Sequence, residues 1–188
     1  MAATEIETCN RALTRIGAQP ITSFGDGSAA ALVAAINYEP IVRAELASCP
    51  WRFAMKQESL TLLAGKTLED LYAWQIPPDA LDLRRVMKGA DPVQYDRLSD
   101  KIISEENEGL WAEYIWRAPE AHWPAYFADA LVTRLEAVFW RSLADAADKS
   151  QAANQLADRA FALARVKDAQ TRSARNPLIY DLVAARRA

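Results

Sequence analysis

Histidine, cysteine and glycine are scarce in this sequence, which has one histidine, two cysteines and six glycines among its 188 residues. Ser–His or Cys–His catalysis would have to use His122, but no recognisable motif supplies a nucleophile and an orienting group, so we interpret it as a surface or cap residue. A zinc site needs several His, Cys or carboxylate ligands at short spacing, whereas Cys9 and Cys49 stand alone. We therefore expect no catalytic residue, no metal site and no bound cofactor.

Signals for membrane insertion and export are also missing. No stretch approaches the ~20 apolar residues of a membrane-spanning helix, and the N-terminus has no charged segment followed by an apolar one. Two cysteines are too few for a disulfide scaffold. On paired antiparallel helices Cys49 would lie roughly 12 Å past the level of Cys9, beyond the ~7 Å that a disulfide tolerates. The net charge of −3 and the pI near 5.3 argue against a polyanion-binding fold, and we expect a protein of a reducing cytoplasm.

Four segments have the apolar periodicity of helices. The first covers residues 4–17, where Thr4 and Glu7 fit a capping box. The second covers 29–48, and Pro40 is expected to kink or divide it. The third covers 124–143 and the fourth 150–172. The residues expected to face inward on the second and fourth helices are Leu32, Ile36, Ile41, Leu46, Ala153, Leu156, Ala160, Leu163 and Val166.

Residues 51–117 have the pattern of short strands separated by turn-forming residues. The candidate strands are 51–63, 71–76, 81–86, 93–98, 101–104 and 110–117. The tryptophans in or beside this region are interpreted as core filling, with an interface as the alternative. They are Trp51, Trp74, Trp111, Trp116 and Trp123. The predicted fold is α+β: mainly an α-helical bundle of about four helices, with a small antiparallel β-sheet inserted at 51–117 and an extended C-terminal tail. Residues 1–172 would form one domain and 173–188 the tail.

Two charged segments are candidate functional sites. Glu105, Glu106 and Glu108 share one turn, which we interpret as a solvated hairpin tip. In a protein that lines a DNA channel, the same loop could repel phosphates and ease DNA passage. From Arg165 to the end, six basic residues face two acidic ones. A basic tail carrying the apolar residues 178–180 could dock into a partner, although a frayed end explains it equally well.

Four stretches of the sequence share residues with one known family. They are Asn10-Arg11-Ala12-Leu13 with Ile16-Gly17, Pro20-Ile21-Thr22-Ser23 and Asp26-Gly27-Ser28; Cys49-Pro50-Trp51-Arg52-Phe53-Ala54; Trp74-Gln75-Ile76-Pro77-Pro78-Asp79-Ala80-Leu81; and Trp123-Pro124-Ala125-Tyr126-Phe127 with Ala130-Leu131. In this order and spacing, which covers most of residues 8–145, the chain resembles the tail tubular protein A family, the head-to-tail adaptors of short-tailed bacteriophages.

The resemblance implies a helical bundle with a β-rich region, no enzymatic activity and a dodecameric ring between the portal and the tail tube or nozzle. The implied partners are the portal protein, the next tail protein, other copies of the chain and double-stranded DNA passing non-specifically through the ring, without a membrane. The implied location is the neck of the virion, assembled in the bacterial cytoplasm. Family members grip the portal with their C-terminal segment. By their chemistry, the residues expected to do so here are Arg172, Arg175, Pro177, Leu178, Ile179 and Tyr180.

The alternative function is a small helical ligand-binding or regulatory domain, in which the aromatic sheet would enclose a pocket. An apolar cavity with a few convergent polar groups would favour it.

Overall fold

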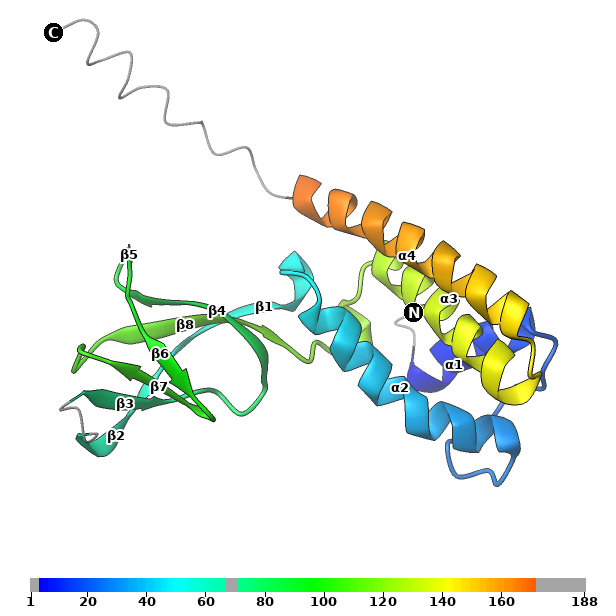
Figure 1. Ribbon diagram of the computed structural model, residues 1–188, viewed down its shortest axis with the longest axis horizontal. Coiled ribbons are helices and arrows are strands. Elements are labelled where there is room, and N and C mark those ends of the chain that lie inside the picture. The colour runs from blue at the N-terminus through cyan, green and yellow to red at the C-terminus, as the bar shows by residue number, and fades with distance from the viewer. Residues whose placement is uncertain (1–3, 67–70, 172–188) are drawn as a thin grey trace, which may run out of the picture.

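The computed structural model describes residues 4–66 and 71–171 of the chain. Figure 1 shows the α-helices gathered at one end of an elongated molecule and the strands at the other. In chain order the elements are α1 (Glu5–Arg15), α2 (Ala29–Ala47), the short 3-10 helix η1 (Arg52–Ala54), β1 (Met55–Ser59), β2 (Thr61–Lys66), β3 (Tyr72–Gln75), β4 (Ala80–Lys88), β5 (Asp91–Pro92), β6 (Asp96–Leu98), β7 (Lys101–Ser104), β8 (Leu110–Trp116), the 3-10 helix η2 (Glu120–His122), α3 (Ala125–Leu143) and α4 (Ala147–Gln170).

The start of α1 is the capping box that the sequence predicts. The Thr4 backbone N–H donates to the Glu7 carboxylate at 2.8 Å, and the Glu7 N–H donates to the Thr4 hydroxyl at 3.1 Å. Two of the free N–H groups at the helix N-terminus are therefore satisfied locally.

Helix α3 is the centre of the helical part, since α1, α2 and α4 all pack against it. Aromatic rings from distant segments meet there: Phe127 lies 5.1 Å from Trp51, 5.2 Å from Trp123 and 5.8 Å from Phe161 between ring centroids, each pair edge to face. Trp51 is fully buried. It lies in the helical core, in the turn before η1. The alternation at 51–55 wrongly predicts that Trp51 begins a strand.

Pro40 does not divide α2, which runs as one helix from residue 29 to residue 47. Proline removes one backbone N–H and so leaves the carbonyl of Ile36 without its usual helical partner. Both Pro40 and Ile36 lie on the exposed side of the helix, where water can bind that carbonyl. The expected division of the helix at Pro40 was wrong for this reason.

The predicted inward faces of α2 and α4 were mostly wrong. Leu46 and Ala153 are buried, but other large apolar residues of the predicted set are exposed: Leu32, Ile36, Leu156, Leu163 and Val166. The buried residues are Ala31, Ala34, Tyr38, Val42 and Leu46 on α2, and Ser150, Ala153, Ala157, Phe161, Ala164 and Asp168 on α4. Alanines let α3 approach closely, while the aromatic residues Tyr38 and Phe161 fill the core. Helices with apolar residues on several sides do not identify their buried face by periodicity alone.

The strands form two four-stranded antiparallel sheets, in the orders β1-β8-β4-β5 and β2-β3-β7-β6. The prediction of a mainly helical bundle with one small inserted sheet was therefore wrong, because the β part is a second body with its own apolar cluster. That cluster joins residues of both sheets: Leu60, Trp74, Ile76, Val86, Ile102, Leu110, Ala112 and Tyr114.

A single extended run supplies one strand to each sheet. The predicted strand 51–63 instead contains η1, β1 and the start of β2, with the buried Leu60 between the strands. The Leu60 N–H donates to the Leu110 carbonyl at 2.8 Å, and beyond this point the chain pairs with β3 instead of β8. Alternation in the sequence shows that a strand is present but not which neighbour it pairs with.

Trp51 and Trp111 form a matched pair for testing this core. Trp51→Ala should lower the free energy of unfolding by about 3–5 kcal/mol, because it leaves a large cavity among packed rings. Trp111 is 49% exposed on β8, so Trp111→Ala should cost less than about 1 kcal/mol. Urea unfolding followed by circular dichroism measures both; equal losses would contradict the placement of Trp51.

Candidate functional site

The chain crosses between the helical and β parts twice, and polar residues fix each crossing: Arg117 with Tyr38, Glu39 and Glu120 at one, and Asp168 at the other. We call these five residues the junction. Arg117 follows β8, and its side chain is 18% exposed. Its guanidinium donates to Glu39 at 3.0 Å, to Glu120 at 2.6 Å and to the Ala118 carbonyl at 2.7 Å. One planar cation therefore ties the end of β8 to α2 and to the segment that leads into α3.

Glu120 is the acceptor at the centre of this network, because the Tyr38 hydroxyl also donates to it at 2.9 Å. Burial alone would raise the pKa of Glu120, but the hydrogen bonds from Arg117, its own backbone and Tyr38 outweigh burial and hold that pKa below its ordinary value. Burial raises the pKa of the Tyr38 hydroxyl, and the neighbouring Glu120 carboxylate raises it further. The Arg117–Glu120 ion pair therefore stays charged at neutral pH.

Asp168 fixes the other crossing between the two parts. It lies near the end of α4 and is only 4% exposed. Its carboxylate accepts from the Arg52 backbone N–H and from the Tyr126 hydroxyl, both at 2.8 Å. Burial raises the pKa of the Tyr126 hydroxyl, and the hydrogen bond to Asp168 adds to the rise. The end of α4 is therefore held beside the point where the chain leaves the helices for the sheets.

A second polar cluster fixes the turn before β4. The Lys56 ammonium lies 2.8 Å from Asp79, and the Tyr114 hydroxyl lies 3.0 Å from Asp79 and 2.8 Å from Glu58. Burial tends to raise the pKa of Asp79, but the hydrogen bonds from Lys56 and Tyr114 lower it overall. These contacts join β1, β8 and the turn that precedes β4.

The predicted acidic loop lies between β7 and β8, and one of its three glutamates contacts neighbouring strands. Glu106 forms an ion pair with Lys88 at 2.6 Å, and its carbonyl accepts from the Trp74 indole N–H at 3.1 Å. Glu105 and Glu108 are exposed. Two of the three predicted carboxylates are therefore presented to solvent, and the third holds the loop against β4.

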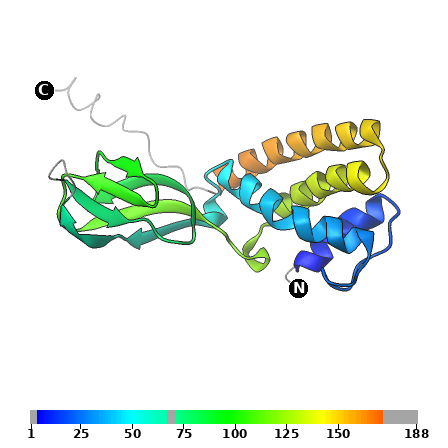
Figure 2. The same cartoon turned by 60° about the horizontal axis from the view of Figure 1, so that its bottom comes forward.

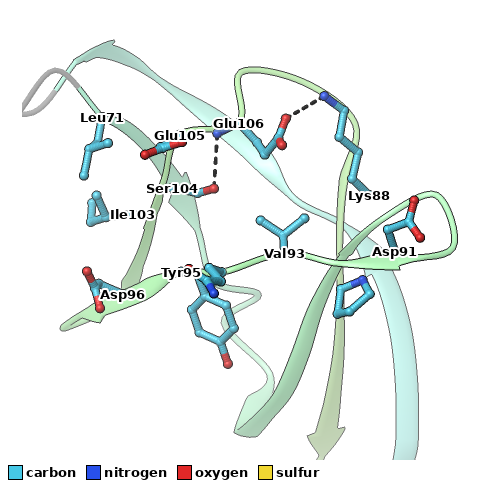
Figure 3. Close-up of a pocket in the computed structure, with 12 residues that line it drawn as sticks. Leu71, Lys88, Asp91, Val93, Tyr95, Asp96, Ile103, Ser104, Glu105 and Glu106 are labelled. Atoms are coloured by element: carbon cyan, nitrogen blue, oxygen red, sulfur yellow. Dashed lines mark hydrogen bonds and ion pairs between the residues drawn. The ribbon is translucent and has the colours of Figure 1, made fainter.

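An open groove of about 990 Å³ runs beside this loop (Figure 3). Figure 3 shows charged side chains around it, with Val93, Tyr95 and Ile103 between them. The charged lining residues are Lys88, Asp91, Asp96, Glu105 and Glu106. This groove is open and lined largely by charged and polar residues, unlike the enclosed apolar cavity that would favour a ligand-binding domain.

The predicted portal-binding residues lie outside the described part of the chain. They are Arg172, Arg175, Pro177, Leu178, Ile179 and Tyr180. The structure nevertheless places the residue from which this segment continues, because Thr171 caps α4 and its N–H donates to the Asp168 carbonyl at 3.1 Å. The C-terminal segment therefore starts at the junction.

The two cysteines and the histidine lie in separate parts of the fold. Cys9 and Cys49 are both free thiols, and burial raises the pKa of Cys9 to about 12, with the nearby Glu5 carboxylate adding to the rise. His122 is exposed in η2, with its ring 6.2 Å from that of Trp116. Within residues 4–66 and 71–171, no group of three or more His, Cys, Asp or Glu side chains could hold a metal ion, and no helix is long and apolar enough to cross a membrane.

Sequence analysis did not identify the junction residues. One indication was available: Asp168 stands seven residues after Phe161 and four after Ala164, so it continues the buried face of α4. A carboxylate on a buried helix face needs a partner. No protein-family model and no curated protein matches the chain.

The junction predicts how stability depends on pH. Because the pKa of Glu120 is lowered in the fold, ionised Glu120 stabilises the protein at neutral pH, and this contribution is lost as the pH falls from the unfolded value of about 4.3 through the lower folded value. The difference in unfolding free energy between wild type and Glu120→Gln should be present at about pH 7 and shrink toward pH 3. Denaturant titrations at several pH values measure it.

Tyr38→Phe is the matched control for this experiment. It removes one hydroxyl donor to Glu120 and keeps the Arg117 ion pair, so its effect should depend less on pH than that of Glu120→Gln. A Glu120→Gln effect that is constant across this pH range would contradict the ion-pair assignment.

Proposed function

We propose that the protein is a structural head-to-tail adaptor of a short-tailed bacteriophage, a ring subunit that joins the portal to the tail and surrounds the DNA path. The observation that carries the proposal is where the four family-like stretches lie in the fold. Each of them supplies a buried or hydrogen-bonded contact, and two of the four meet at Asp168.

The first stretch closes the connection between α1 and α2. The Asn10 side-chain amide donates to the Ile21 carbonyl at 2.9 Å, and the Ile21 N–H donates to the Asn10 side-chain oxygen at 2.7 Å. A side chain that pairs with a backbone in both directions fixes the loop as a strand partner would. The third stretch contributes Asp79, which fixes the turn before β4.

The second and fourth stretches meet at the junction. From the second, the Trp51 indole N–H donates to the Glu45 carbonyl at 2.8 Å, and the backbone of Arg52 donates to Asp168. From the fourth, the Trp123 indole N–H donates to the Ala118 carbonyl at 2.9 Å, and Tyr126 donates to the same Asp168 carboxylate. The second and fourth stretches therefore supply contacts that hold the two parts together.

A two-part molecule with a fixed junction suits an adaptor. Such a subunit contacts one partner through one end and another partner through the other, and it must keep the two contacts in register. Several of its charged side chains form ion pairs between elements, including Arg134 with Glu45 and Arg15 with Glu136. These pairs fix how the helices sit against one another instead of facing a substrate.

The C-terminal segment is the portal-binding element in this proposal. It carries Arg172 and Arg175 and then the apolar residues 178–180, and it continues from the junction. Arginines can form charge-assisted hydrogen bonds with carboxylates of the portal, and an apolar group can fill a pocket beside them.

Deleting residues 173–188 tests this element. The truncated protein should keep the circular dichroism signal of the described helices and strands, because their contacts lie within residues 4–66 and 71–171, and should lose its binding to purified portal rings in co-sedimentation. Retained binding would refute the assignment of the segment. An intact protein that does not bind portal rings would refute the adaptor function itself.

Removing charge from the acidic loop tests whether the loop faces the DNA path. In the proposal Glu105 and Glu108 face the DNA path and repel its phosphates, so Glu105→Gln combined with Glu108→Gln should slow DNA ejection from assembled particles. Glu106 is left unchanged, because its ion pair with Lys88 supports the loop. Asp91→Asn combined with Asp96→Asn is a control of equal charge change across the neighbouring groove. Unchanged ejection kinetics in the loop variant would exclude a channel-facing loop.

A further inference from the structure

Helices α2 and α4 each expose a row of large apolar side chains. On α2 these are Leu32 and Ile36, each 62% exposed. On α4 they are Leu156, Leu163 and Val166, which are 56%, 65% and 56% exposed. We call these rows the α2 stripe and the α4 stripe. Single exposed leucines are ordinary, but rows of them on one helix face mark a contact surface.

The composition of α2 shows how unusual its exposed face is. From Ala29 to Tyr38 the helix contains no charged residue, and the exposed positions around the stripe include Ala29, Ala35 and Pro40. Only one side of this segment is buried in the chain. A helix that is apolar all round is normally covered on all sides.

The α4 stripe has the spacing of a helix-packing seam. Ala152, Leu156, Arg159, Leu163 and Val166 are exposed and follow one another at intervals of four, three, four and three residues. This alternation keeps the side chains on one line along a helix, as at a helix–helix contact. Arg159 interrupts the apolar row with a cation.

The two stripes lie on opposite sides of the helical part. The buried faces of α2 and α4 both pack against α3, which runs between them. Figures 1 and 2 show α2 and α4 flanking α3 from different sides in both views. The α2 stripe therefore cannot reach the α4 stripe of its own chain, but it can reach that of a second copy.

The charges beside the stripes are complementary. Beside the α2 stripe the exposed Asp26 carries a negative charge, and no other charged residue follows before Glu39, which is already paired with Arg117 and Arg43. Along the α4 side, Arg159, Arg165 and Lys167 are exposed, and none forms an ion pair within residues 4–66 and 71–171. A cation within an apolar row favours a partner that offers a carboxylate at its edge.

We propose that the α2 stripe of one copy packs against the α4 stripe of the next. Two unlike surfaces in contact make a head-to-tail interface, which generates a closed ring or an open filament rather than a symmetric dimer. That the assembly is a ring rests on the proposed function, whereas the pairing of the two stripes comes from their position, apolarity and charge.

Disulfide cross-linking of full-length protein tests the pairing. In a Cys49→Ser background, Ile36→Cys protein is mixed with Leu156→Cys or Leu163→Cys protein, with and without purified portal rings. Cross-linked dimers should form only in the mixtures, because each variant alone carries one half of the contact. Dimers of a single variant, or no dimers in any mixture, would overturn the proposal. Leu98→Cys, at an exposed position on β6, is the control and should not cross-link.

Charge and polarity changes provide a second measurement. Ile36→Glu or Leu163→Glu should weaken self-association by roughly thirtyfold or more, since each places a carboxylate at the centre of an apolar contact. Arg159→Glu should weaken it by roughly tenfold. The matched controls Leu98→Glu and Lys101→Glu, both at exposed positions on the sheets, should leave it unchanged. Sedimentation velocity over a concentration series measures these effects, and an unchanged association constant in the stripe variants would overturn the pairing.

The outcomes separate this inference from the proposed function. Mixed cross-links without portal binding would support the pairing and refute the adaptor function. Portal binding without mixed cross-links would refute the pairing and leave the adaptor function standing.

Discussion

The carboxylate of Asp168 is the contact on which the relation between the two parts of the molecule depends. The chain passes from the helices to the sheets beside Arg52 and returns through Arg117. The first crossing is tied to α4 by Asp168, and the second is tied to α2 by the Arg117–Glu39 ion pair. A buried carboxylate without donors is costly, so the fold is stable only when the backbone of Arg52 and the hydroxyl of Tyr126 are in place. This requirement couples the ends of elements that are more than one hundred residues apart.

Sequence analysis located most of the helices and strands, but not which faces of them are buried or which distant residues they contact. Capping residues and turn formers act over a few positions, and so Thr4, Glu7 and the strand turns marked the element ends well. Which face of a helix is buried depends on the size of its neighbours. Tyr38 and Phe161 occupy buried positions on α2 and α4, whereas the leucines at residues 32, 156 and 163 lie on the exposed sides of these helices. The sequence did not reveal the junction because its contacts join distant positions. Arg52, whose backbone donates to Asp168, lies 116 positions before it.

The β part shows a different limit. Periodicity revealed short strands from 55 to 116, yet the division into two sheets depends on a change of partner at Leu60, where the chain leaves β8 for β3. No local pattern encodes that change, because alternation along a strand does not identify the strand with which it pairs. The tryptophans were grouped together by sequence, but Trp51 belongs to the helical core, Trp74 to the apolar cluster between the sheets, and Trp111 to the surface.

The place where α4 ends has a mechanical consequence. A force applied to the residues after Thr171 along the axis of α4 acts on the long α3–α4 seam in shear, since the 24-residue helix lies against α3. Shear requires many side-chain contacts to slip together, whereas a force at right angles to the helix would peel them apart one turn at a time. Because Asp168, near the same end of α4, also accepts from the Arg52 backbone, a force that enters after Thr171 would be shared between this seam and the crossing to the sheets.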